Sequence, residues 1–192
     1  MRTVHPIEAE SYRRLRAAVD TSALPPRTRD VVERIVHTTA DPAWLPDLVA
    51  DEAALDAGAE ALAGGTPLVV DVAMVAAGVT AYEATCCLGP AIDGLTRTAA
   101  GIRLAAQRVP DGGVWAIGNA PSALDELVRL ANEGRIRPAL VVGLPVGYVG
   151  AVEAKAALRA SGLPQLSNRS ARGGSAVAAA AVNALLYGDP LA

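Results

Sequence analysis

The sequence has no phenylalanine, and its two tryptophans and four tyrosines bring the aromatic residues to only 3%. Proteins that bind single-stranded nucleic acid usually stack bases on aromatic side chains, so this shortage disfavours such a platform. The net charge of −3 also provides no basic field for a nucleic-acid backbone. We therefore expect no nucleic-acid partner.

Cysteine and histidine are scarce as well, with two of each. Cys86 and Cys87 are adjacent, which is a poor geometry for a bridge between them, and no third cysteine exists. A disulfide framework and metal sites built on cysteine are thereby excluded within one chain, and a metal site that combines the two histidines with carboxylates is only a weak alternative. We expect no metal site and a reducing, cytoplasmic location.

Hydrophobic runs long enough to cross a membrane are lacking, although 52% of the residues are apolar and the mean hydropathy is +0.30. The longest uncharged stretch, residues 173–188, is shorter than the ~20 residues of a transmembrane helix and contains Ser175 and Asn183. The first residues show no apolar segment of a secretory signal. We therefore expect a buried helix at 173–188 and no membrane partner.

What the sequence does contain is a regular alternation of helical and strand patterns. Apolar residues at helical spacing predict helices around Tyr12, around Ile35 and over 45–63. From residue 66 onward, short apolar runs alternate with helical patterns. This order predicts one α/β domain over residues 1–192: a three-layer α/β/α fold with a mainly parallel sheet and an N-terminal helical segment.

Ligands of such sheets bind at the carboxyl ends of the strands, so the loops there are candidate sites. The predicted strands are 67–72, 85–88, 113–117, 139–143 and 164–167, and the predicted helices among them are 95–107, 124–131, 151–160 and 175–186. The candidate loops are 71–74, 118–121, 143–148 and 168–175.

His37 is the main candidate for proton transfer near neutral pH, because His5 lies beside Pro6 in the N-terminal arm. His37 also ends an apolar helical face, where a histidine can simply bind the last carbonyls and interact with the helix dipole. The residue pattern leaves both interpretations open.

Three segments have the chemistry to bind an anion. The strongest is 169–175, with two arginines and two glycines before the last helix. Residues 118–122 open another helix, and Arg97 at a helix start could clamp a carboxylate. A glycine-rich turn, ordinary capping and a surface arginine are the structural alternatives. Neither a phosphate-binding loop ending in Lys-Ser/Thr nor a dinucleotide fingerprint is present.

Taken together, these segments closely resemble the precorrin-8X methylmutase family of cobalamin biosynthesis. The resemblance runs from about Pro6 to Leu186, and it is specific because the segments occur in the family's order and spacing. They are residues 8–12, 36–38, 71–75, 96–100, 116–124, 143–149 and 173–175.

The resemblance implies an isomerase that moves a methyl group from C-11 to C-12 of the corrin ring by a 1,5-sigmatropic shift. Precorrin-8X would become hydrogenobyrinic acid, or cobalt-precorrin-8 would become cobyrinic acid. No external cofactor is implied, because the migrating methyl is already on the tetrapyrrole substrate. The resemblance further implies a homodimer with the site near the subunit interface, and it leaves open a transient hand-over of product to the next enzyme of the pathway.

The family's catalytic histidine falls on His37, which the resemblance makes a general acid or hydrogen-bond donor to the macrocycle. Ser11 and Arg97 match family positions that contact the substrate. The carboxylates of the substrate need further donors. The residues of suitable type are Thr38, Asn119, Gly174 and Ser175, the last two through their backbone amides.

Three positions depart from the family's pattern. Ala73 replaces a usual acidic residue, and Ser170 and Ala171 stand where a glycine and a basic residue are usual. The altered last loop motivates an alternative, a corrin-binding carrier protein without turnover. A third candidate, a hydrolase of the α/β type, ranks low because no Gly-x-Ser-x-Gly elbow follows a strand. The sequence does not decide whether the substrate holds cobalt.

Overall fold

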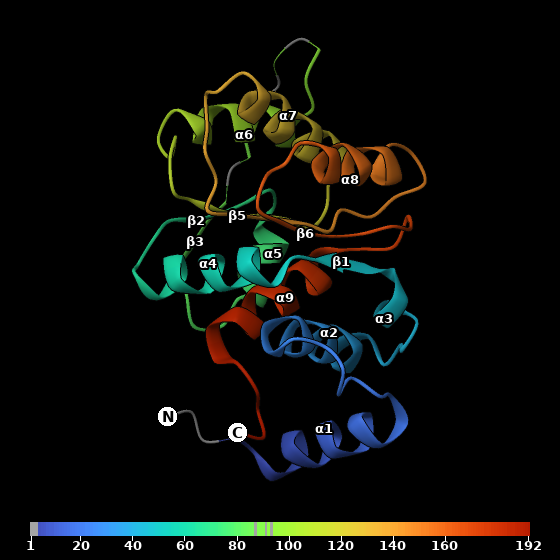
Figure 1. Ribbon diagram of the computed structural model, residues 1–192. Helices are drawn as coiled ribbons and strands as arrows, with labels where there is room; N and C mark the ends of the chain where they lie inside the picture. The colour runs from blue at the N-terminus through green and yellow to red at the C-terminus, as the bar shows by residue number, and fades with distance from the viewer. Residues whose placement is uncertain (1–3, 87, 91, 93) are drawn as a thin grey trace.

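The described residues form a six-stranded sheet that lies between two layers of helices (Figure 1). The computed structural model describes residues 4–86, 88–90, 92 and 94–192. The strand order is β1-β6-β5-β4-β2-β3, and within it only the β1–β6 pair is antiparallel. The strands are β1 (Leu48–Ala50), β2 (Leu68–Val70), β3 (Ala84–Cys86), β4 (Val114–Ile117), β5 (Leu140–Gly143) and β6 (Gln165–Asn168).

Helices α4, α5 and α9 cover one face of the sheet, and α6, α7 and α8 cover the other (Figure 1). Helix α2 packs against α9, and α1 lies outermost, against α2. The predicted three-layer fold with a mainly parallel sheet and N-terminal helices is confirmed. The helices are α1 (Pro6–Ala18), α2 (Pro26–Thr39), α3 (Trp44–Asp47), α4 (Glu52–Ala63), α5 (Ala73–Gly78), α6 (Arg97–Ala106), α7 (Pro121–Asn132), α8 (Ala151–Ala160) and α9 (Ser175–Tyr187).

The sheet separates two apolar cores, because successive strand side chains point to opposite faces. Val69, Trp115 and Val141 belong to the core shared with α6, α7 and α8. Leu68 and Val70 belong to the other core, which α2, α4 and α9 complete. Burial of these faces fixes each helix layer on the sheet, and so fixes where the helix ends meet the strand ends.

Helix α9 is buried almost all round, as the uncharged stretch predicts. It lies between the sheet and α2 (Figure 1). Its start packs closely on the end of β4, where a Cβ added at Gly118 would lie 2.8 Å from Ala178 Cβ and 3.0 Å from Ser175 Cα. None of the described helices is long and apolar enough to cross a membrane.

The prediction of one helix over 45–63 is wrong. The chain instead forms α3, then β1, then α4. The backbone of β1 pairs with β6, with Val49 opposite Ser167, and Asp51 then caps α4 by accepting a hydrogen bond from Ala53 N at 3.1 Å. Residues 48–50 thus form the edge strand of the sheet although their local spacing also suits a helix. Helix α4 then begins after the Asp51 cap.

Two further segments differ from expectation in detail. The loop expected at 71–74 is short, because α5 begins at Ala73 directly after the end of β2. The strand expected over 85–88 ends at Cys86, and Cys87 lies outside the described residues.

Candidate active site

His37 and Ser11 meet although 26 residues separate them in the chain. His37 lies in the last turn of α2, and α1 places the Ser11 Oγ atom 3.0 Å from the His37 Nδ1 atom. The buried Tyr12 ring stacks on the imidazole, with the ring centroids 4.7 Å apart. Among the described residues no hydrogen bond engages Nε2 of His37, so this nitrogen can face a ligand.

Burial lowers the pKa of the half-buried His37, and the charge of Arg34 lowers it further, while Glu8 acts in the opposite direction. Arg34 lies over the Tyr12 ring at 5.7 Å from its centroid and 3.7 Å from Glu8. The imidazole is therefore mainly neutral at neutral pH in the free protein. An approaching anion would favour its protonated form.

Arg97 is exposed at the start of α6, and it makes no ion pair within the part of the chain that the structure describes. Thr96 caps α6, and its Oγ1 atom lies 2.7 Å from the Ser122 Oγ atom in the first turn of α7. This contact joins the starts of α6 and α7 at the carboxyl end of the sheet. The Arg97 guanidinium at that rim has no ion pair with any described residue, which suits a carboxylate of a ligand.

The backbone amides at 118–120, predicted as an anion site, are already engaged. The buried Asp71 carboxylate accepts hydrogen bonds from the N–H groups of Gly118, Asn119 and Ala120, at 3.1, 2.9 and 2.8 Å. The helix start therefore binds an anion, but the anion belongs to the protein itself. Only the exposed side chain of Asn119 remains for a ligand.

The expected amide of Gly174 is likewise engaged, because Gly174 N donates to Leu144 O at 2.9 Å. A Cβ at Gly173 would lie 2.4 Å from both Leu144 O and Pro145 O, so the glycine is required for this close approach. Ser175 begins α9 directly after this contact. Its amide stays a candidate donor, whereas that of Gly174 is not available in this conformation.

The loop before α9 is organised by Lys155, which the sequence reasoning did not place in the site. Lys155 is fully buried, and its Nζ atom donates to Asn168 Oδ1 at 2.8 Å, to Arg172 O at 2.7 Å and to Ser170 O. Burial lowers its pKa to about 8. Asp47 closes the same loop by accepting from Ser170 N and Oγ. No local sequence signal marks Lys155, because its partners come from another strand and loop.

The two arginines of this loop have different surroundings. Arg172 pairs with Asp41 and lies over the Trp44 ring, 4.7 Å from its centroid. Arg169 is exposed and has no ion pair among the described residues. Of the predicted arginine pair, Arg169 is therefore the one available to an anion.

The remaining candidates lie on the first two helices. Thr38 is exposed beside His37, and its Oγ1 donates to Arg34 O at 2.8 Å. His5 caps α1 by accepting from Ile7 N through Nδ1 at 3.2 Å, which gives it a local structural role. No cluster of three or more His, Cys, Asp or Glu side chains that could hold a metal lies within the described residues.

The site residues thus form two groups within one chain. Ser11, His37 and Thr38 come from α1 and α2, whereas Arg97 and Asn119 come from the starts of α6 and α7. Helices α2 and α6 lie on opposite sides of the sheet (Figure 1). Among the described residues, no hydrogen bond or ion pair joins the two groups.

Comparison with known proteins gives one consistent family. A family model described as precorrin-8X methylmutase (CbiC) matches residues 6–188. The cobalt-precorrin-8 methylmutase of Methanocaldococcus jannaschii is 39% identical over 163 residues, which cover 81% of this chain and 77% of that protein. The precorrin-8X methylmutase of Pseudomonas aeruginosa is 38% identical over 194 residues, 93% of each chain. The crystal structure of a precorrin-8X methylmutase from Thermus thermophilus superposes with a TM-score of 0.86 at 32% identity, covering 94% of this chain and 93% of that one.

Proposed function

Since the chain belongs to the precorrin-8X methylmutase family, we propose that His37 is the acid that assists its methyl shift. The protein is an isomerase of cobalamin biosynthesis, and its reaction moves a methyl group within a precorrin substrate. In our proposal the methyl moves from C-11 to C-12 by a 1,5-sigmatropic shift. The contact between Ser11 Oγ and His37 Nδ1 is the observation that carries the assignment of His37.

The roles that we propose for Ser11 and His37 are supported by their geometry. Ser11 holds Nδ1 and Tyr12 covers one face of the ring, so the imidazole has a fixed orientation with Nε2 available to the macrocycle. His37 then donates a proton or a hydrogen bond as the π electrons of the macrocycle redistribute during the methyl shift. The migrating methyl leaves C-11 and bonds to C-12 of the same molecule, so no external methyl donor takes part.

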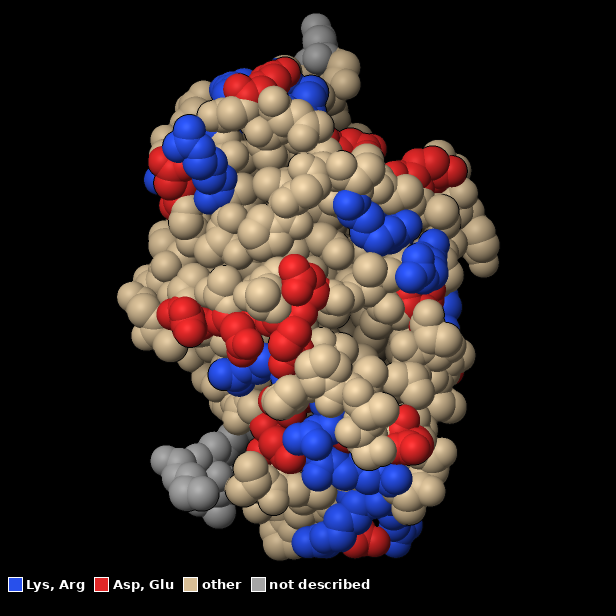
Figure 2. Space-filling model, in the orientation of Figure 1, with Lys and Arg blue, Asp and Glu red and all other residues tan. Residues whose placement is uncertain are grey.

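The charges of the protein suit an anionic substrate only locally. The net charge is −3, yet blue side chains gather over the part of the surface that Figure 1 assigns to α1 and α2 (Figure 2). Carboxylates bound near His37 would favour its protonated form, which the free protein disfavours. Arg97 and Arg169, which make no ion pair with any described residue, are the guanidinium groups that we assign to the outer carboxylates, together with donors from Asn119 and Ser175. Thr38, beside His37, is assigned as a contact residue, because its hydroxyl already donates to Arg34 O.

The altered last loop gives no support to a carrier without turnover. Ser170 donates from Oγ to Asp47 Oδ2 at 2.6 Å, and Ala171 O accepts a hydrogen bond from Gly147 N at 3.2 Å. Both residues therefore help to form the loop. The exposed Ala73 begins α5 beside Asp71 and leaves the Ser11–His37 pair unaffected.

Turnover provides the direct test of this function. Purified protein mixed with precorrin-8X should convert its chromophore to that of hydrogenobyrinic acid, as followed by the absorption spectrum. A parallel reaction with cobalt-precorrin-8, which should yield cobyrinic acid, establishes which substrate is preferred. Binding of both compounds without any spectral conversion would reject the isomerase and leave a carrier.

We also infer that residues 1–192 are one cytoplasmic domain that acts as a homodimer with its site near the interface. The loop after β5 carries exposed apolar side chains, with Tyr148 fully exposed and Val149 88% exposed. Exposed apolar side chains that lie together on a surface mark interaction sites, and a second copy would cover these. Release of the product from a site near the interface would allow its transient hand-over to the next enzyme of the pathway.

Replacing Tyr148 with glutamate should break this dimer, because the interface would bury an unpaired charge. Light scattering after size exclusion should report two chains for the wild type and one for Tyr148→Glu. Glu153→Gln, an exposed change on the following helix, serves as the control and should remain dimeric. A wild-type protein that stays monomeric at micromolar concentration would refute the proposed dimer.

A further inference from the structure

Helix α1 is held to the rest of the protein by little apolar contact. Tyr12 is its only buried residue among those described, and Leu15 is half-buried. Yet α1 must keep the Ser11 Oγ atom within 3.0 Å of the His37 Nδ1 atom. Polar contacts at the other end of the helix add to this attachment of α1 to α2.

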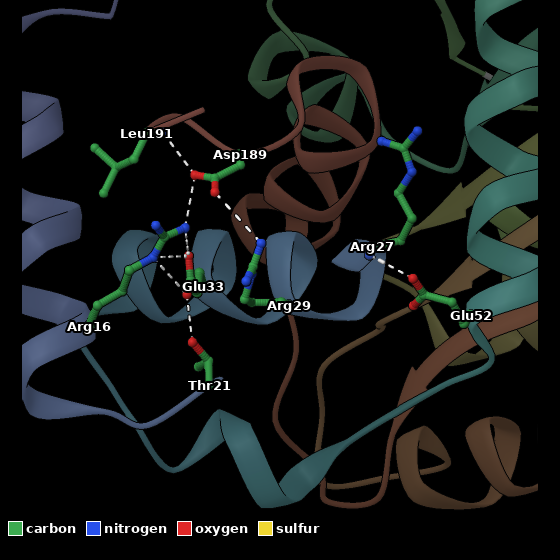
Figure 3. Close-up of polar contacts among 8 residues, drawn as sticks. All are labelled: Arg16, Thr21, Arg27, Arg29, Glu33, Glu52, Asp189 and Leu191. Atoms are coloured by element: carbon green, nitrogen blue, oxygen red, sulfur yellow. Dashed lines mark hydrogen bonds and ion pairs between the residues drawn. The ribbon is translucent and has the colours of Figure 1, made fainter. Parts of the chain in front are cut away.

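The strongest of these contacts joins Arg16 of α1 to Glu33 of α2 (Figure 3). Arg16 Nε donates to both Glu33 oxygens at 3.0 Å, and Arg16 Nη2 donates to Glu33 Oε2 at 2.8 Å. The Glu33 side chain is only 1% exposed. Thr21 Oγ1 adds a hydrogen bond to Glu33 Oε1 at 2.6 Å. A buried carboxylate needs such partners, so Arg16 has one strongly preferred position.

The segment after α9 adds a second carboxylate, that of Asp189, to the contact between Arg16 and Glu33. Asp189 Oδ1 accepts from the same Arg16 Nη2 at 2.8 Å, and the Asp189 side chain is only 18% exposed. Asp189 Oδ1 also accepts from Leu191 N at 2.8 Å, and Arg29 Nη2 lies 3.7 Å from Asp189 Oδ2 (Figure 3). The C-terminal segment is thus folded back onto the junction of α1 and α2.

We propose that Arg16, Glu33 and Asp189, here called the Arg16 clamp, are positioning residues that hold Ser11 and Tyr12 against His37. The inference rests on the proposed role of His37 and deepens it. The clamp lies more than one helical turn from Ser11, so it acts through the placement of α1 and not through contact with the substrate. Glu33 and His37 are four residues apart on α2, so one helix carries both the anchor of the clamp and the acid.

The clamp depends on the shape of the guanidinium group as well as on its charge. Because its donors form a planar fork, arginine can bind both oxygens of Glu33 and, at the same time, one oxygen of Asp189. Lysine keeps the charge but offers a single flexible ammonium group. Arg16→Lys therefore separates a geometric role from a purely electrostatic one, and it leaves the buried Glu33 with a partner so that the protein can fold.

Titration of His37 by NMR tests the proposal without any turnover. The groups that face His37 are Ser11 and Tyr12, with Glu8 also on α1 and Arg34 on α2. Loss of the α1 contacts exposes the imidazole and should raise its pKa toward the ordinary value of 6.5. Departure of Glu8 opposes that rise, but burial is the larger cause, so the net shift is upward. His5→Asn assigns the two histidine signals.

We expect Arg16→Lys and Asp189→Asn to raise the His37 pKa and to lower kcat by about tenfold, with KM little changed, since a misplaced catalytic group slows the chemical step. Arg14→Lys is the matched control, because the one described residue with which Arg14 forms an ion pair is Glu10, on the exposed side of the same helix. An unchanged His37 titration in both clamp variants, with folding verified by circular dichroism, would overturn the clamp. The outcome for His37→Ala is separate, since it tests the acid role itself.

Discussion

Replacing His37 with alanine should slow conversion of the substrate at least about a hundredfold, while the protein stays folded and still binds the tetrapyrrole. General acid catalysis by a positioned side chain contributes a factor of roughly a hundred to ten thousand, and no second histidine lies within this site. Rates come from the absorption change under saturating substrate, and a spectral titration gives the dissociation constant.

The second histidine offers a matched control for this prediction. His5 caps α1, and asparagine is an equally good capping residue, so His5→Asn keeps the helix start while removing the imidazole. That variant should retain its activity. Near wild-type turnover in His37→Ala would remove His37 from the acid role, and a loss of activity in His5→Asn alone would transfer that role to His5.

The dependence of kcat/KM on pH follows from the surroundings of His37. Burial and Arg34 lower its pKa below the ordinary 6.5, so the protonated form is populated only at lower pH in the free enzyme. A protonated acid therefore predicts that kcat/KM rises as the pH falls through a midpoint below 6.5. This limb should be absent from the residual rate of His37→Ala.

Replacing Arg97 with alanine should weaken substrate binding by about tenfold to a hundredfold and change kcat much less. A hydrogen bond to a charged group contributes about 1.5–3 kcal/mol, and our proposal assigns Arg97, whose guanidinium has no ion pair among the described residues, to a carboxylate of the substrate. The fold should not suffer, because the side chain is exposed and makes no ion pair among the described residues.

Arg108 provides the matched control for Arg97. It is exposed just beyond the opposite end of α6, and it too lacks an ion pair within the described part of the chain. Arg97→Ala and Arg108→Ala therefore change the net charge equally, while only the first removes a donor from the carboxyl edge of the sheet. Equal dissociation constants for the two variants, or an unchanged constant in Arg97→Ala, would contradict the assignment of Arg97 to a substrate carboxylate.

The parallel strands and most helices could be predicted because their signals are local. The runs around Val69, Trp115 and Val141 are bounded by glycine or proline, and they are buried on both faces as parallel strands require. Residues 48–50 could not be assigned in this way. Their pairing partner is β6, more than a hundred residues later, and sheet pairing outweighs a weak helical spacing.

The candidate site shows the same division between local and distant causes. His37, Ser11 and Arg97 could be chosen from the sequence through the family resemblance. Whether the amides of the predicted anion sites are free could not be predicted from the sequence. Asp71, at the end of a neighbouring strand, accepts hydrogen bonds from the amides at 118–120, and Leu144 O accepts one from the amide of Gly174. The contacts of Lys155 and Arg172 likewise depend on residues of other segments, Asn168 in β6 for Lys155 and Asp41 for Arg172.

By itself, the sequence determined the α/β class, the small number of residues able to transfer a proton, and the family to which the chain belongs. These follow from composition, local periodicity and the order of short motifs. Only the tertiary structure decided which donors are free and which are engaged, that Ser11 and Tyr12 fix the His37 ring, and that Arg16 and Asp189 hold α1 in place. Each of these depends on side chains from separate elements meeting within about 3–5 Å, a condition that packing imposes and local sequence does not record.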